Sequence, residues 1–153
     1  MKWTLFATLE EFLITKIKRI PIAIADKLYQ FHIYPMDIVR KELGIWITAS
    51  LSSGYRPKWY ELSKRRSGNS QHTFEVDWKL GSGAVDWTCE NFAENKDRFL
   101  KSIMKHTQYT RICMYETFLH CDYKDTPNGE RQLFEYAFDK DDEKWKWFFI
   151  NNF

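Results

Sequence analysis

The hydrophobic period of this chain changes at Gly44, and the change restricts the fold to classes in which helices precede a sheet. Before Gly44, apolar residues recur at intervals of three and four, as on one face of a helix. After it, every second residue is apolar, at Ile45, Ile47, Ala49 and Leu51, as on one face of a strand. Further strand-like and helical segments follow. We therefore expect an α+β fold, with N-terminal helices followed by a small, mostly antiparallel sheet.

Three helices are predicted before this change. The first covers residues 9–19 and begins with a capping-box pattern. The second begins at Pro21 and should end at Pro35, since proline cannot continue the hydrogen-bond ladder of a helix. The third covers residues 36–43 and ends at Gly44, a residue suited to the left-handed backbone that follows a helix.

The rest of the chain has no repeat and no linker, so the 153 residues are expected to form one domain. Its parts would be a helical part (1–44), a core that carries the functional site (45–125) and a charged, aromatic tail (126–153). We expect the aromatic residues of the tail to serve packing rather than anchoring to a surface. The predicted elements after Gly44 are a strand at 45–52, a helix at 57–66, a strand at 74–80, a turn at 81–83, a strand at 84–89, a helix at 90–105, one strand at 111–123 and a turn at 126–129.

Composition argues against several partners and settings. Lys and Arg number 23 against 21 Asp and Glu, a formal charge of +2, so nucleic acid is not an expected partner. Three cysteines without paired spacing argue against a disulfide framework and favour a reducing compartment. No apolar run is long enough for a membrane span, and the N-terminal run is too short for a signal peptide. We expect a chain made in the cytoplasm without membrane insertion.

Two histidines and an aspartate stand where chemistry is expected. A regular strand over 111–123 would project Glu116, His120 and Asp122 from one face. Asp86 lies among bulky apolar neighbours, and His72 follows a loop of Gly, Ser and Asn. Singly, each fits an ordinary role: a solvated strand face, a turn-capping acid or a structural histidine. Together, two imidazoles and a carboxylate from three elements match a catalytic zinc site, which keeps one position open for water.

Four short motifs occur in a fixed order along the chain. They are Ser-Gly-Tyr-Arg-Pro at 53–57, Ser-Gln-His at 70–72, Gly-Ala-Val-Asp at 83–86 and Phe-Leu-His-Cys-Asp at 118–122. This ordered set resembles the zinc D-Ala-D-Ala carboxypeptidases and phage L-alanyl-D-glutamate endopeptidases, which share the Hedgehog/DD-peptidase fold. The resemblance extends over residues 20–123.

The resemblance implies a role for each matching residue. The zinc ligands would be His72, Asp86 and His120. The substrate-binding residues would be Tyr55, Arg56 and Ser70, with the planar guanidinium of Arg56 well shaped for a substrate carboxylate. A structural ion pair is the alternative for Arg56.

The general base should be an acid shortly before the last histidine. Glu116 is the candidate, because it would share a strand face with His120. A related acid of the family often stands one position later, where this chain has Thr117, which cannot act as a base. Asp122 is the second candidate, and its alternative role is to hold the ring of His120.

The spacing between His72 and Asp86 departs from the family, in which it is much shorter. If residues 72–89 formed a regular hairpin about the turn at 81–83, His72 would lie roughly 20 Å from Asp86. The two could not then share a metal ion. The extra residues loop out, or the strand begins later and bends, or the site is inactive.

By resemblance, the chain would be a zinc-dependent peptidase that hydrolyses a peptide bond in the peptidoglycan stem. It would be a phage lysis enzyme that is made in the infected bacterium and acts on the cell wall after release. Carboxypeptidase and endopeptidase activity both fit the motifs. The alternatives are a phage structural or binding protein that keeps the fold with weak or no catalysis, and a cytoplasmic metal-binding protein.

Overall fold

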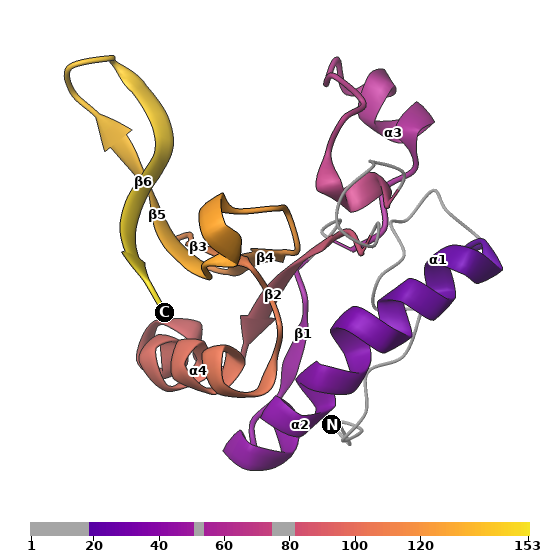
Figure 1. Ribbon diagram of the computed structural model, residues 1–153, viewed down its shortest axis with the longest axis vertical. Helices are drawn as coiled ribbons and strands as arrows, with labels where there is room; N and C mark the ends of the chain where they lie inside the picture. The colour runs from indigo at the N-terminus through magenta and orange to yellow at the C-terminus, as the bar shows by residue number, and fades with distance from the viewer. Residues whose placement is uncertain (1–18, 51–53, 75–81) are drawn as a thin grey trace.

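The computed structural model describes residues 19–50, 54–74 and 82–153 (Figure 1). Within these ranges the chain has an α+β fold, as predicted, in which a helical run is followed by a six-stranded mixed sheet. The helix predicted over 9–19 and the strand predicted over 74–80 lie outside the described residues, apart from one end residue each. None of the described helices combines the length and the hydropathy of a bilayer-spanning segment.

The helical part is one unbroken run, made of α1 (Ile22–Lys27), the π-helical η2 (Leu28–Ile33) and α2 (Tyr34–Leu43). The prediction that Pro35 ends a helix is therefore wrong. Proline in a helix leaves the carbonyl four residues earlier without its donor, and its ring crowds that carbonyl. Here that carbonyl belongs to Phe31, and the hydroxyl of Tyr123 donates to it. The π-helical turns before Pro35 widen the helix at this point.

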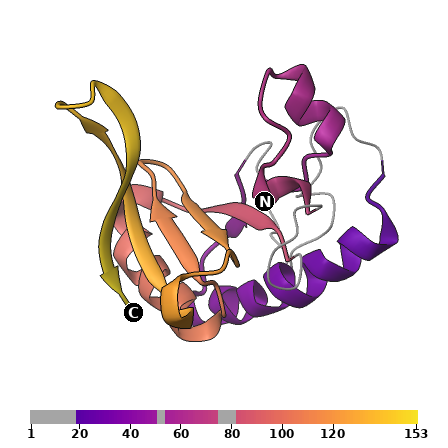
Figure 2. The ribbon, with the colours of Figure 1, turned by 45° about the horizontal axis from the view of Figure 1, so that its top comes forward.

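The sheet has the strand order β1-β2-β4-β3-β5-β6, and only β3 and β5 pair in parallel. The predicted, mostly antiparallel sheet is thus confirmed. In Figure 2 the helix α4 lies against one face of the sheet, and α2 packs beside α4. The strands are β1 (Ile47–Ala49), β2 (Ala84–Cys89), β3 (Arg111–Met114), β4 (Leu119–Asp122), β5 (Gln132–Asp139) and β6 (Lys144–Asn152), and the other helical elements are α3 (Lys58–Ser63), η3 (Gln71–Thr73), α4 (Phe92–His106) and η5 (Pro127–Gly129).

Residues 111–123 form two strands rather than the single strand predicted. β3 and β4 are antiparallel neighbours joined by the turn 115–118, in which the N–H of Tyr115 donates to the carbonyl of Phe118 over 3.0 Å. The turn contains no Gly, Pro, Asn or Asp, so the residues that usually mark a turn are missing from the sequence. Because the chain reverses here, Glu116 and His120 do not share a strand face.

The aromatic tail is part of the sheet. Its β5 pairs with β3, and β6 returns along β5 as the edge strand. The hairpin β5–β6 extends away from the helices (Figure 1). The tail thereby adds two strands, β5 and β6, to the sheet that carries the candidate site. This arrangement was not predicted from the sequence.

A buried chain of hydrogen bonds joins the helical run to the sheet. The indole N–H of Trp87 donates to the hydroxyl of Tyr109 over 3.0 Å, and this hydroxyl lies 2.8 Å from Nδ1 of His32. Nε2 of His32 lies 2.6 Å from the carbonyl of Ser82. Since a carbonyl only accepts, Nε2 carries the proton, and Nδ1 accepts from Tyr109. Every member is satisfied when His32 is neutral.

This network predicts a loss of stability in mild acid. Burial lowers the pKa of His32 from 6.5 to about 3, although the bond to Ser82 opposes the shift. Below about pH 6.5 the unfolded chain binds a proton that the folded chain excludes, so stability falls by on the order of 1 kcal/mol per pH unit down to about pH 3. His32→Gln, which does not titrate, should show a shallower fall in urea unfolding between pH 7 and 5. Equal slopes for both proteins would contradict this assignment.

A second prediction concerns Gly83, whose φ of +72° is left-handed and whose added Cβ would lie 2.4 Å from the ring of Phe74. Gly83→Ala should lower the free energy of unfolding by about 3 kcal/mol or more, because the ring is buried and cannot retreat. Gly44→Ala is the matched control. Gly44 also has a left-handed φ, of +64°, but nothing lies within 4 Å of an added Cβ. This substitution should therefore lower the free energy of unfolding by only about 1–2 kcal/mol. Equal losses in thermal or urea unfolding would refute the role of the Phe74 contact.

Candidate metal centre

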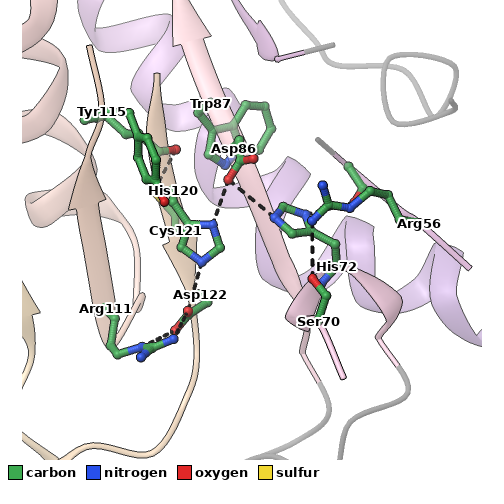
Figure 3. A network of polar contacts seen from close by, with 12 residues as sticks. Arg56, Ser70, His72, Asp86, Trp87, Arg111, Tyr115, His120, Cys121 and Asp122 are labelled. Carbon is green, nitrogen blue, oxygen red and sulfur yellow. Dashed lines mark hydrogen bonds and ion pairs between the residues drawn. The ribbon is translucent and has the colours of Figure 1, made fainter. Parts of the chain in front are cut away.

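Three separate elements bring His72, Asp86 and His120 together (Figure 3). Asp86 in β2 and His120 in β4 are directly opposite each other in the antiparallel register. His72 comes from the short helix η3, where its N–H donates to the hydroxyl of Ser70 over 3.3 Å. The carbonyl of His72 accepts from the N–H of Arg56 over 2.9 Å, which fixes η3 beside the segment that precedes α3.

The three side chains are in direct contact and buried. Oδ1 of Asp86 lies 2.7 Å from Nδ1 of His120 and 3.4 Å from Nε2 of His72. One ligand atom from each residue lies within 4.8 Å of the others. The structure thus unites the three residues predicted as ligands in a cluster that could hold a metal ion.

His72 and Asp86 are in contact and are not separated as they would be in a regular hairpin. His72 lies in a 3-10 helix rather than a strand, and Phe74 has a left-handed φ of +57°, which turns the chain at that point. The ring of Phe74 then packs on Gly83, immediately before β2. This contact holds the start of β2 close to η3, so that His72 lies beside Asp86.

Each histidine is oriented by a partner on its other nitrogen. Nδ1 of His72 lies 3.1 Å from the carbonyl of Gly54, so this nitrogen carries a proton and the lone pair of Nε2 faces the cluster. Nε2 of His120 lies 3.0 Å from Oδ2 of Asp122, and Arg111 binds the same carboxylate through two nitrogens. Carboxylate–histidine pairs of this kind commonly support metal ligands. Of the two predicted roles of Asp122, the structure supports that of holding His120.

The cluster favours positive charge between its two carboxylates. Burial alone would lower the pKa of His120, but hydrogen bonds to Asp122 and Asp86 outweigh it and raise the pKa to about 9. Burial would raise the pKa of Asp86, yet His72 and His120 hold it well below its usual range. Burial lowers the pKa of His72, partly offset by Asp86. A proton on His120 therefore occupies the place that a metal cation would take.

The cluster opens onto a cleft of ≈550 Å³. Nε of Arg56 lies 2.8 Å from Glu61, and Nη2 of Arg56 donates to Ser70 over 3.2 Å. Arg56 thus forms the ion pair that was the alternative prediction, and it also lines the cleft. A second guanidinium, that of Arg66, shares Glu61 at 3.1 Å. The lining residues are Arg56, Arg66, Ser70, Gln71, His72, Asp86, Tyr115, Phe118, His120, Tyr136 and Trp147.

Several lining residues were not foreseen. The ring of Trp147 lies 5.3 Å from that of His120, and the guanidinium of Arg111 lies 4.8 Å from the Trp147 ring. Tyr136 and Trp147 belong to the tail hairpin, and Arg66 follows α3. The alternation of aromatic and other residues in the tail could have indicated strands there. It does not reveal which strand β5 pairs with, so it could not place Tyr136 and Trp147 at the cleft.

Three predicted site residues do not line the cleft, and one of them, Asp122, lies behind His120 and holds its ring. Tyr55 is buried in the core with its ring 6.3 Å from that of Phe74, so contact with substrate is not supported. Glu116 is exposed in the turn 115–118 and does not line the cleft, because the strand that should have aligned it with His120 is interrupted. Among the residues that the structure describes, Asp86 is the one carboxylate on the cleft wall.

Comparisons with protein-family models, with curated proteins and with solved structures found no match to this chain. The cleft and its side chains are therefore the basis for the function. Two imidazoles and a buried carboxylate could together hold a metal ion, and two arginines line the same cleft.

The geometry predicts about one divalent ion per chain after reconstitution with Zn²⁺ or Co²⁺, measured by elemental analysis of the desalted protein. Asp86→Ala should abolish binding, because it removes the oxygen shared by both histidines. His106→Ala is the control, since His106 contacts Glu42 on α2 and lies outside the cluster. Retention of the ion by Asp86→Ala, or equal loss in His106→Ala, would show that the ion binds elsewhere.

Proposed function

We propose that this protein is a zinc-dependent peptidase that hydrolyses a peptide bond in the peptidoglycan stem. The observation that carries the proposal is the buried cluster of His72, Asp86 and His120, whose ligand atoms lie within 4.8 Å of one another on the wall of an open cleft. Catalytic zinc sites use three such protein ligands and leave a further position open. The Hedgehog/DD-peptidase fold and the setting of a phage lysis enzyme belong to the same proposal, supported by the ordered motifs.

The donor set suits zinc. It consists of two imidazole nitrogens and one carboxylate oxygen, with both rings already oriented by Gly54 and Asp122. A bound zinc ion lowers the pKa of its water and polarises a carbonyl. The same donors also hold ferrous iron in oxygenases, so preferential retention of iron when Fe²⁺ and Zn²⁺ are offered together would argue against a hydrolase.

The basic side of the cleft suits a substrate with carboxylates. Arg56 is held in place by Glu61 and Ser70 before any ligand arrives, so binding costs little side-chain ordering. Arg66 adds a second positive charge beside it. A peptidoglycan stem peptide carries free carboxylates, and a guanidinium binds these through two parallel hydrogen bonds. In this role Arg56 orients the substrate and Asp122 orients His120.

A second candidate is a binding protein that keeps the cluster without efficient catalysis. It is favoured by one observation: no carboxylate other than Asp86 lines the described part of the cleft, and Asp86 is itself a proposed ligand. Glu116 is exposed in the turn between β3 and β4. Proton transfer by a positioned acid typically contributes 10²–10⁴-fold to a rate, so its loss would leave a weak enzyme.

Hydrolysis of purified peptidoglycan tests the two candidates. The zinc-loaded protein should release new amino termini, and His120→Ala should lower the rate at least about 100-fold because a ligand is lost. His106→Ala should retain the wild-type rate, as a histidine outside the cluster. Glu116→Gln should retain the rate at saturating substrate, since this side chain is exposed outside the metal cleft.

Three outcomes would decide between the proposals. Zinc binding without release of amino termini supports the binding protein. Release that persists undiminished in His120→Ala contradicts a metallopeptidase. A marked loss of rate at saturating substrate in Glu116→Gln would return Glu116 to the role of general base and imply that the turn moves toward the cleft when substrate binds.

A further inference from the structure

A ladder of four stacked aromatic rings runs outward from the edge of the metal cleft. Ring centroids of Phe118 and Tyr115 are 4.4 Å apart, those of Tyr115 and Tyr136 are 4.4 Å apart, and those of Tyr136 and Trp145 are 5.4 Å apart. The interplanar angles are 15°, 23° and 23°, so all three contacts are stacked. The rings come from the turn 115–118, β5 and β6. Trp145 ends the ladder with 60% of its surface exposed.

This ladder forms the wall of a separate groove of ≈360 Å³, here called the aromatic groove. Its lining residues are Tyr115, Glu116, Thr117, Phe118, Tyr136 and Trp145. Three of them, Tyr115, Phe118 and Tyr136, also line the metal cleft. The two depressions therefore share a wall, and a chain-like ligand could occupy both. Exposed apolar surface of this kind commonly marks a site of binding.

The charge of the aromatic groove limits what it can bind. Its one charged lining residue is Glu116, so the lining offers no cation for a phosphate. The lysines on either side of Trp145 are paired with acids: Lys144 lies 4.0 Å from Asp142, and Lys146 contacts both Asp139 and Asp142. A strand of nucleic acid needs basic residues along its backbone as well as aromatic rings for its bases. The aromatic groove supplies only the rings.

A neutral saccharide fits both the aromatic lining of the groove and the absence of a cation from that lining. The C–H face of a pyranose ring is apolar and packs on an aromatic ring, while its hydroxyl groups seek carboxylate and hydroxyl partners such as Glu116 and Thr117. A site of this type combines apolar walls with a few polar groups that set orientation. Because the four rings already stack on one another, Trp145 is held in place before a ligand arrives, which lowers the entropic cost of binding.

We propose that the aromatic groove binds a saccharide chain, with Trp145 as the main contact. Under the proposed function, on which this identification rests, the chain is the glycan strand that carries the stem peptide. The peptide would extend into the metal cleft, and the sugars would lie along the hairpin β5–β6. The shared wall of Tyr115, Phe118 and Tyr136 places the two parts of one substrate side by side.

Titration of the full chain with a linear hexamer of N-acetylglucosamine tests the inference without requiring catalysis. Binding followed by tryptophan fluorescence or by calorimetry should be saturable, and equal in metal-free and zinc-loaded protein. Trp145→Ala should weaken it at least about tenfold, and Trp145→Phe should recover part of the loss. Trp59→Ala is the matched control, because Trp59 on α3 is similarly exposed, at 54%.

Absence of saturable binding by the wild type, or an equal effect of Trp145→Ala and Trp59→Ala, would overturn the inference. Tighter binding of a single-stranded oligonucleotide than of the hexamer would overturn it in favour of nucleic acid. The outcome is independent of the peptidase test. Saccharide binding without peptide hydrolysis would contradict the proposed function alone. Hydrolysis without saccharide binding would contradict the proposed role of the aromatic groove alone.

Discussion

A buried carboxylate is the constraint on which the centre of this structure depends. Asp86 is 6% exposed, and a charge so placed is tolerated only where it is paired and hydrogen-bonded. His120 and His72 meet it from two sides, Asp122 meets the far nitrogen of His120, and Arg111 meets Asp122. This row of hydrogen-bonded acidic and basic groups crosses from η3 over β2 and β4 to β3. Removal of any member takes one hydrogen-bonding or ionic partner from its buried neighbour, so the row stabilises the relative positions of all four elements.

The members of the His72–Asp86–His120 cluster were predictable from the sequence, whereas the contacts that bring them together were not. Asp86 stood out because it lies among bulky apolar residues in a strand pattern, and the short motifs placed His72 and His120 beside it. Their contact depends on the turn at Phe74 and on its packing against Gly83, which are tertiary features. The long spacing between His72 and Asp86 appeared to conflict with a shared site because the alternation of apolar residues after His72 was treated as one continuous strand.

One of the remaining errors arose because a local signal was overruled by a distant partner. Pro35 lies within a helix because Tyr123, far along the chain, supplies the hydrogen bond that the carbonyl of Phe31 would otherwise lack. The place of the tail in the sheet was not predicted, because nothing in its sequence indicates that β5 pairs in parallel with β3. Glu116 was misplaced for the opposite reason, since its turn contains no turn-forming residue. Elements with complete local signals, such as β2 and α4, were predicted to within two residues.

The cross-strand pairing of Asp86 with His120 has a consequence for how the sheet assembles. A shift of β4 by one residue would place Val85 or Trp87 opposite His120 and would turn the imidazole to the other face of the sheet. A cation held by Asp86 and His120 would therefore stabilise the native alignment of these two strands over either one-residue slip. Such a cluster would help to select the strand register as well as form a site on the cleft wall.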